Sequence, residues 1–238
     1  MALLTTVTAA DVPRDVIVAW SGGKDSALAL REILGDARYR VAALLTTVTA
    51  EYDRISIHGV RRALLRRQAE ALGLPLDEVL ISPGASNHEY ETNMGAALAV
   101  LRTRIPGLGT VVFGDLFLAD IRAYRERMLA RIGMRGLFPL WLRDTRALAY
   151  DFVRLGYRAV LVCVDAAQLA GEFAGREFDA GLLSDLPPGV DPCGENGEFH
   201  TFVYAGPGLR EPVSHERGPV VVRDGRFVYC DLMETTSQ

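Results

Sequence analysis

Residues 16–34 constrain the fold more than any other part of the chain. The apolar run at 16–20 (VIVAW) has the composition of a buried strand, and residues 27–34 carry apolar side chains at helical spacing. Between them, Gly22 and Gly23 let the backbone turn sharply and present consecutive N–H groups at the start of the helix. Such groups bind anions, so the sequence predicts a phosphate site between a strand and a helix.

The same loop contains Lys24, the one lysine among 26 basic side chains. Compositional drift that exchanges surface lysine for arginine accounts for the excess of arginine. It also makes the remaining lysine informative, because a compact ammonium fits a tight site where a planar guanidinium does not. The serine hydroxyls of the loop add hydrogen-bond donors. We therefore expect a phosphate-binding set of Ser21, Gly22, Gly23, Lys24, Asp25 and Ser26.

Strands and helices alternate along the first half of the chain, which is typical of a parallel sheet built from βαβ units. Short apolar runs at 41–46, 79–81 and 110–113 predict three further strands. Helical spacing of apolar residues predicts helices over 58–73 and 87–104, and a third that ends at Gly133. The expected fold class is α/β, with a doubly wound parallel sheet.

The pattern changes near residue 143. A helix and a strand at 159–164 follow, and glycine and proline become dense from residue 171 onward. This punctuation predicts hairpin strands at 200–204, 220–222 and 227–229. We predict a first domain that carries the phosphate-binding loop over residues 1–143, with 1–13 as a candidate arm, and a smaller α+β domain over residues 144–238.

The octapeptide ALLTTVTA occurs twice, at residues 2–9 and 43–50. Two copies do not make a solenoid, which needs about three or more units. The second copy overlaps the strand predicted at 41–46. We expect the first copy to form an arm or an edge strand.

Composition excludes several classes of protein. With 49% hydrophobic and 24% charged residues, the chain is too apolar for general disorder. It has no apolar run near the roughly 20 residues that span a bilayer and no basic signal-peptide start, so we expect a cytoplasmic protein without a membrane partner. A net charge of -4 argues against a nucleic-acid partner. Three widely spaced cysteines indicate neither a disulfide framework nor a CxxC metal site.

The string SGGKDS at residues 21–26 fits neither the Walker A pattern nor the dinucleotide pattern GxGxxG. In its strand-loop-helix setting it resembles the PP-loop of the ATP pyrophosphatase superfamily. The resemblance implies a HUP-type domain whose loop holds the β and γ phosphates of ATP as the leaving group. It also implies Mg²⁺ as a cofactor, with Asp25 as the nearest ligand.

Six further segments extend the comparison: LLTT (44–47), SIHG (56–59), QAEALGLP (68–75), GD (114–115), PLW (139–141) and GENGEFHT (194–201). In this order they resemble the diphthine-ammonia ligase family over most of residues 15–205. The resemblance implies that ATP adenylates a carboxylate and that ammonia or an amine then displaces AMP. Diphthine, a modified side chain of elongation factor 2, is the acceptor that the family name implies; another acid stays open as an alternative.

The carboxyl ends of the strands form the ligand-binding edge of a doubly wound sheet. Leu45 and Thr46 lie at the end of the second predicted strand, where they either bind adenine or simply end a core strand. Gly114 and Asp115 follow another strand, and we expect Asp115 to bind Mg²⁺ or ribose. His58 begins a predicted helix, where it either contacts ATP or caps the helix.

Basic side chains follow on the next predicted helix. Arg122 and Arg125 are spaced to reach phosphate or substrate, and we assign Arg122 to substrate binding. The alternative is that at least one of them belongs to a solvated charged face.

Residues 194–201 gather two carboxylates, an amide, a histidine and a hydroxyl between glycines. In the resembled family this segment lines the acceptor site. Glu195 and Glu198 would bind a cationic substrate or the proton of ammonia, and His200 would carry a proton near neutral pH. The expected catalytic set is Lys24, Asp25, Glu195, Glu198 and His200. The expected substrate-binding set is Arg122, Glu195, Asn196, Glu198, His200 and Thr201.

A structural reading of this segment stays open: a tight polar turn whose side chains satisfy its own backbone. Cys193 beside it has no partner in the sequence, and we expect a small buried residue there, not a nucleophile.

These features together predict an ATP-dependent C–N ligase that releases pyrophosphate and then AMP. Two alternatives belong to other classes: a sensor that binds ATP or AMP without turnover, and a hydrolase that forms AMP and pyrophosphate. The sequence leaves the nitrogen donor and the oligomeric state open, a homo-oligomer included.

Overall fold

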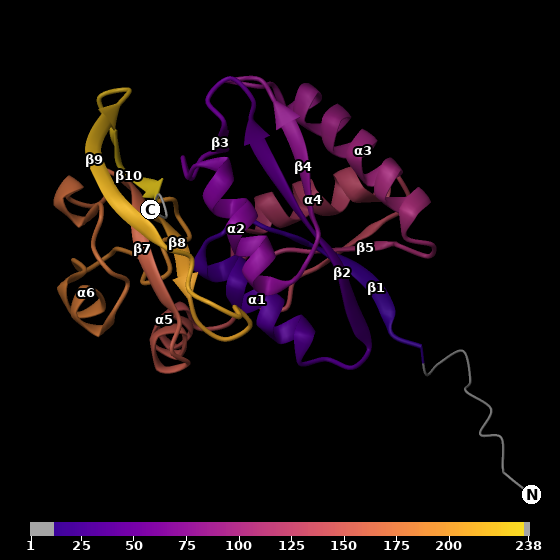
Figure 1. Ribbon diagram of the computed structural model, residues 1–238, viewed down its shortest axis with the longest axis horizontal. Coiled ribbons are helices and arrows are strands. Elements are labelled where there is room, and N and C mark those ends of the chain that lie inside the picture. Colours follow the sequence, from indigo (N-terminus) through magenta and orange to yellow (C-terminus); the bar gives the residue numbers. More distant parts are fainter. Residues whose placement is uncertain (1–11, 236–238) are drawn as a thin grey trace, which may run out of the picture.

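Two β-sheets organise the chain in the computed structural model, which describes residues 12–235 (Figure 1). Sheet A comes from the first half of the chain and sheet B from the second. The first ALLTTVTA copy, at 2–9, lies outside the described residues, as does most of the arm predicted over 1–13. Within residues 12–235, no helix is both long enough and apolar enough to cross a membrane.

Sheet A is doubly wound, as the alternating pattern predicts. Its parallel strands follow the order β4-β2-β1-β5-β6, and the short β3 pairs antiparallel with the end of β2. The direction of winding reverses between β1 and β5, and ligands bind at such a switch point in sheets of this kind. The strands are β1 (Arg14–Ala19), β2 (Tyr39–Thr49), β3 (Arg54–Ile55), β4 (Leu76–Ile81), β5 (Thr110–Val112) and β6 (Arg135–Leu137).

Helices cover both faces of sheet A, which explains why its strands are apolar runs. In β1, Val16 and Val18 belong to the core on one face, whereas Ile17 belongs to the core on the other. The first core lies between the two sheets and contains α1 and α2, and the second contains α3 and α4 (Figure 1). These helices are α1 (Lys24–Leu34), α2 (Arg62–Leu72), α3 (Asn87–Arg104) and α4 (Ala119–Ala130).

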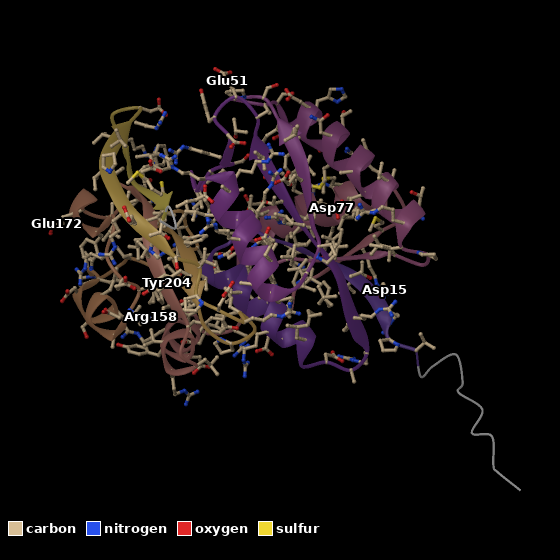
Figure 2. All side chains as sticks on the ribbon, viewed as in Figure 1. Asp15, Glu51, Asp77, Arg158, Glu172 and Tyr204 are labelled. Carbon is tan, nitrogen blue, oxygen red and sulfur yellow. The ribbon has the colours of Figure 1, made fainter. Side chains whose placement is uncertain are left out.

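Sheet B is antiparallel, with the strand order β8-β7-β10-β9. Figure 2 shows Arg158 and Tyr204 on neighbouring strands of this sheet, with the guanidinium carbon 5.2 Å from the ring centroid. Its elements are α5 (Thr145–Arg154), β7 (Arg158–Asp165), the 3-10 turn η1 (Gly171–Phe173), α6 (Ala180–Asp185), β8 (Phe199–Ala205), β9 (His215–Arg223) and β10 (Phe227–Glu234). Mixed helices and antiparallel strands confirm the smaller α+β region predicted from the sequence.

Three local predictions differ from the structure. The helix expected over 58–73 begins at Arg62, because residues 56–59 form a turn in which Ile57 and Gly59 have positive φ. His58 therefore lies in that turn and does not cap a helix. The strand expected at 200–204 pairs with β7, so of the three predicted hairpin strands it is the other two, β9 and β10, that form a hairpin with each other. The short strands β3 and β6 were not predicted, since two or three residues carry no clear periodicity.

The phosphate-binding loop of residues 21–26 lies against β8, the edge strand of sheet B. The Val203 N–H donates a hydrogen bond to the Gly22 carbonyl at 2.9 Å, and the Lys24 N–H donates to the Thr201 hydroxyl at 3.0 Å. The loop thus covers backbone groups that an edge strand would leave open. It joins sheet A to sheet B.

A second junction involves Asp231 of β10. Its carboxylate accepts hydrogen bonds from Arg54 at 2.9 Å and from Arg61 at 2.7 Å, and both arginines belong to the sheet A half. Burial alone would raise the pKa of this carboxyl, but the two guanidinium groups outweigh burial and lower the pKa to about 2.

We predict that Asp231→Asn lowers the free energy of unfolding near neutral pH by about 1–2 kcal/mol. The folded pKa of about 2 lies below the ordinary value of 3.8, so this contribution is present above pH 4 and disappears as the pH falls toward 2. Urea unfolding at pH 7 and pH 3 measures the difference. The exposed Asp151–Arg154 pair provides the control, Asp151→Asn. A wild-type advantage of equal size at both pH values would contradict the assignment.

Candidate functional site

A cavity of about 550 Å³ lies at the carboxyl ends of β1, β2 and β5, at the switch point of sheet A. Its lining combines the phosphate-binding loop, the end of β2, one side each of α3 and α4, and part of residues 194–201. The predicted site residues that line it are Ser21, Gly23, Lys24, Asp25, Ser26, Leu45, Thr46, His58, Gly114, Asp115, Glu195, His200 and Thr201. Those that do not are Gly22, Arg122, Asn196 and Glu198.

The loop geometry depends on close backbone approaches. Gly22 has a φ of +79°, and a Cβ there would lie 2.5 Å from Leu65 and 2.8 Å from Gln68. A Cβ on Gly114 would lie 2.8 Å from the backbone carbon of Asp25, so the loop rests directly on the turn after β5. Only glycine fits at these two positions. The start of α1 therefore lines the cavity, where helix N-termini favour anions, although the N–H of its first residue, Lys24, already donates to the Thr201 hydroxyl.

Lys24 is held in a narrow slot and is only 2% exposed. Its ammonium donates to the Asp25 carboxylate at 2.8 Å and to the Cys193 carbonyl, and it lies 5.6 Å from the centre of the Phe199 ring. Burial disfavours the ammonium, but the charge of Asp25, the hydrogen bond to it and the other acidic groups nearby together outweigh burial and keep the pKa of Lys24 above its ordinary value. A permanent cation therefore lies beside the phosphate-binding loop.

Asp115 and Arg125 form an ion pair at the cavity wall, with Arg125 Nε 2.9 Å from the carboxylate. Arg125 also lies over the ring of Phe113, at 4.5 Å from its centroid. Arg122, which we assigned to substrate, is directed elsewhere: it pairs with Glu126 and lies over the Trp141 ring at 4.7 Å. Arg122 therefore fits the alternative given above, a side chain on a solvated charged face, and it also stacks on an aromatic ring.

Residues 194–201 divide into two groups. Glu195 faces the cavity and accepts hydrogen bonds from the N–H groups of Leu116, at 2.7 Å, and Phe117, at 3.4 Å. Glu198 is buried and instead binds the turn itself, because its carboxylate accepts from the Asp191 N–H and from the Asn196 side-chain amide. The two expectations for this segment, a ligand-facing site and a self-satisfied polar turn, thus each describe part of it.

The pKa values of Glu195 and Cys193 are both raised, but the consequences for their chemistry differ. Burial raises the pKa of Glu195 to about 7, with the Asp25 charge adding to the effect and the Leu116 N–H opposing it. Glu195 can therefore exchange a proton near neutral pH. Burial also raises the pKa of the Cys193 thiol, which agrees with a small buried residue and not with a nucleophile.

His58 and His200 form a ring pair with centroids 4.4 Å apart. Burial, together with the nearby Lys24 charge, lowers the pKa of His200 to about 4 and that of His58 well below its ordinary range. Both rings are neutral at pH 7. His200 therefore differs from our expectation of a group that titrates near neutrality, because the sequence could not indicate its burial or its distance from Lys24.

Buried hydrogen-bonding atoms without a protein partner gather at this cavity. Within residues 12–235 three of them, Thr46 Oγ1, His58 Nδ1 and Tyr124 OH, belong to cavity-lining residues, and the fourth, Glu198 Oε2, lies in the adjoining turn. Unpaired buried groups are unfavourable unless a ligand satisfies them, so the cavity suits a ligand with polar edges. Tyr124 and its neighbours Tyr90 and Met94, on α3 and α4, were missed in the sequence because their spacing is that of ordinary core residues.

The carboxylates available for a metal are Asp25 and Asp115. The described residues contain no group of three or more His, Cys, Asp or Glu side chains able to hold an ion by themselves. Mg²⁺ commonly takes only one or two protein carboxylates and completes its shell with phosphate oxygens and water. The donors present fit Mg²⁺ bound together with a nucleotide.

Comparisons with known proteins agree with the motifs. Residues 14–136 match the family described as "Diphthamide synthase N-terminal domain", and residues 144–216 match "Diphthamide synthase C-terminal domain". Two relatives are named "Diphthine--ammonia ligase". The one from Schizosaccharomyces pombe is 26% identical over 84% of this chain and 37% of its own length. The one from Danio rerio is 28% identical over 91% of this chain and 92% of its own length. The chain thus spans little more than a third of the S. pombe relative.

We predict that Glu195→Gln changes how stability depends on pH. Because the folded pKa of about 7 exceeds the ordinary 4.5, the wild type gains stability at low pH and loses it as the pH rises through 7. Glutamine does not titrate, so the variant should gain about 1–2 kcal/mol relative to the wild type between pH 5 and pH 8. Denaturant unfolding across this range is the measurement.

Glu172, which Figure 2 shows at the outer surface beyond sheet B, supplies the matched control, Glu172→Gln. Its stability curve should run parallel to that of the wild type. A parallel curve for Glu195→Gln would show that the Glu195 carboxyl is not perturbed.

Proposed function

Because the chain belongs to the diphthamide synthase family, we propose that it is an ATP-dependent ligase that joins a carboxylate and ammonia into an amide. The motifs predicted this family from the sequence, and the family matches confirm it. One observation carries the activity: the phosphate-binding loop and the ionisable residues of 194–201 line the same cavity. The names of the relatives support diphthine as the acceptor and ammonia as the nitrogen donor.

The proposed reaction has two steps. A carboxylate oxygen of the acceptor attacks the α-phosphorus of ATP, the bond to the bridging oxygen breaks, and pyrophosphate leaves. Ammonia then attacks the carbonyl carbon of the acyl-adenylate, and AMP leaves with the electron pair of the broken C–O bond. One proton departs from the nitrogen, giving the amide, AMP and H⁺.

The phosphate-binding loop acts on the leaving group. Negative charge grows on pyrophosphate as it departs, and fixed N–H groups at the start of α1 together with the Lys24 ammonium stabilise that charge more than the charge of bound ATP. Asp25 and Asp115 are the residues that would hold Mg²⁺, which would neutralise phosphate charge when bound. The loop thereby favours departure of pyrophosphate.

Glu195, His200 and His58 act on the acceptor. Glu195, with a pKa near 7, is suited to take the proton that the nitrogen loses. His58 and His200 are neutral, and each can donate one N–H to a developing oxyanion without adding a charge that would compete with Lys24. These roles for Glu195, His58 and His200 are proposals.

The test is to follow pyrophosphate and AMP formed from ATP and Mg²⁺, with and without ammonium and an acceptor that carries diphthine. The ligase should form both products only when all substrates are present. The absence of AMP under every condition would favour a nucleotide sensor. AMP formation that is indifferent to ammonium and acceptor would favour a hydrolase.

We predict that Lys24→Arg, although neutral in charge, lowers kcat/KM for pyrophosphate release by about tenfold or more, because a planar guanidinium does not fit the slot between Asp25 and Phe199. The control is Arg31→Lys, a charge-neutral exchange of a half-exposed side chain in the last turn of α1. It should leave kcat/KM unchanged. Near-normal turnover of Lys24→Arg would mean that a lysine is not required at this position.

A further inference from the structure

Gln68 on α2 is a polar side chain with no exposure to solvent. Its carbonyl oxygen accepts a hydrogen bond from the Trp20 indole N–H at 2.8 Å. Its amide nitrogen donates to the Gly22 carbonyl at 2.9 Å and to the Val203 carbonyl. One amide therefore joins the end of β1, the phosphate-binding loop and the edge strand of sheet B.

The chemistry of the neighbours fixes the orientation of this amide. Two of them are backbone carbonyl oxygens, which only accept, so the NH₂ group must face them. The third is an indole N–H, which only donates, so the carbonyl must face Trp20. Both N–H groups of the amide donate a hydrogen bond, so flipping the amide would break all of the hydrogen bonds that Gln68 makes.

The consequence for the loop follows from peptide geometry. The Gly22 carbonyl receives the Gln68 amide and also the Val203 N–H, so it points into the protein. In a planar trans peptide the N–H of the next residue points the opposite way. The Gly23 N–H must therefore turn away from Gln68. It donates to the Ser21 hydroxyl at 3.3 Å, and Gly23 and Ser21 both line the cavity.

We propose that Gln68 is a positioning residue that aims the Gly22–Gly23 peptide, so that the Gly23 N–H faces the phosphates of the bound nucleotide. Gln68 touches no substrate and acts through the loop. The proposal rests on the proposed function only in naming ATP as the ligand. It gives α2 a role in the reaction in addition to its packing against sheet A.

Packing alone would not select an amide at this position. The surroundings of Gln68 include Leu65 and other apolar side chains of the core between the sheets. An apolar side chain of similar length would fill the same volume and would bring no polar group of its own into the core. Glutamine is better suited than such a side chain only because the Gly22 and Val203 carbonyls need donors and the Trp20 indole needs an acceptor.

Two variants of Gln68 test the proposal. Gln68→Met keeps the length and removes all three hydrogen bonds, whereas Gln68→Glu keeps the acceptor for Trp20 and loses the NH₂ donors. Phe152→Leu is the matched control, because Phe152 is fully buried on α5 and contacts Tyr157 and Phe178, not the loop. Thermal unfolding of the three variants establishes which of them have comparable losses of stability.

Two measurements follow. The first is amide hydrogen exchange of residues 21–24 without nucleotide, and the second is the Kd for ATP with Mg²⁺ by calorimetry. We expect Gln68→Met to increase the exchange rate of the loop amides about tenfold and to raise the Kd for ATP about tenfold. A change of this size is expected for the loss of a buried hydrogen bond. Gln68→Glu should change both quantities at least as much, because one of its carboxylate oxygens would face the Gly22 and Val203 carbonyl oxygens without a proton to donate. Phe152→Leu should leave both quantities at wild-type values despite its lower Tm.

Loop exchange at the wild-type rate in the Gln68 variants, or equally fast exchange in Phe152→Leu, would overturn the proposal. If Gln68→Met does not fold, Gln68→Glu alone decides by the same criteria. If the wild type binds no ATP, the proposed function fails, while loop exchange still decides the role of Gln68. If ATP binds to the Gln68 variants as tightly as to the wild type, the function stands and the positioning role fails.

Discussion

The hydrogen bond from the Val203 N–H to the Gly22 carbonyl is the contact on which the rest of the site depends. It joins the phosphate-binding loop of sheet A to the edge strand of sheet B, and the bond from the Lys24 N–H to Thr201 repeats the connection two residues away. His200 and Thr201 belong to β8 themselves. These two cavity-lining residues are therefore held in place relative to the loop.

Most charged side chains of the cavity are paired before any ligand binds, and Glu195, with a pKa of about 7, is the cavity carboxyl held by backbone N–H groups. The buried Lys24 is paired with Asp25, Arg125 is paired with Asp115, and the two histidines are neutral. Apolar side chains of α3 and α4 form another wall, which lowers the local dielectric and strengthens each of these interactions. Under the proposed function, a polyphosphate in this site would meet fixed dipoles, which is a condition that favours electrostatic stabilisation of a leaving group.

The sequence predicted the features that depend on local pattern. The apolar run of β1, the glycine loop and the bounds of α3 at 87–104 all follow from periodicity and turn chemistry, and they suffice to give the doubly wound fold. It could not predict contacts between residues far apart in the chain. In the sequence, Gln68 looks like an ordinary polar residue of an amphipathic helix. Its contacts with Gly22 and Val203 exist only in the folded chain. The low pKa of His200 and the inward turn of Glu198 likewise depend on neighbours that the sequence does not reveal.

The central claim is that ATP and a carboxylate react directly in one cavity shared by the two sheets. Transfer of ¹⁸O tests it most directly: an acceptor labelled in its carboxylate is converted with ATP and ammonium, and the AMP is analysed by mass spectrometry. Attack of the carboxylate on the α-phosphorus predicts one ¹⁸O atom from the acceptor in each AMP formed. AMP without label, or label found instead in inorganic phosphate, would contradict the account.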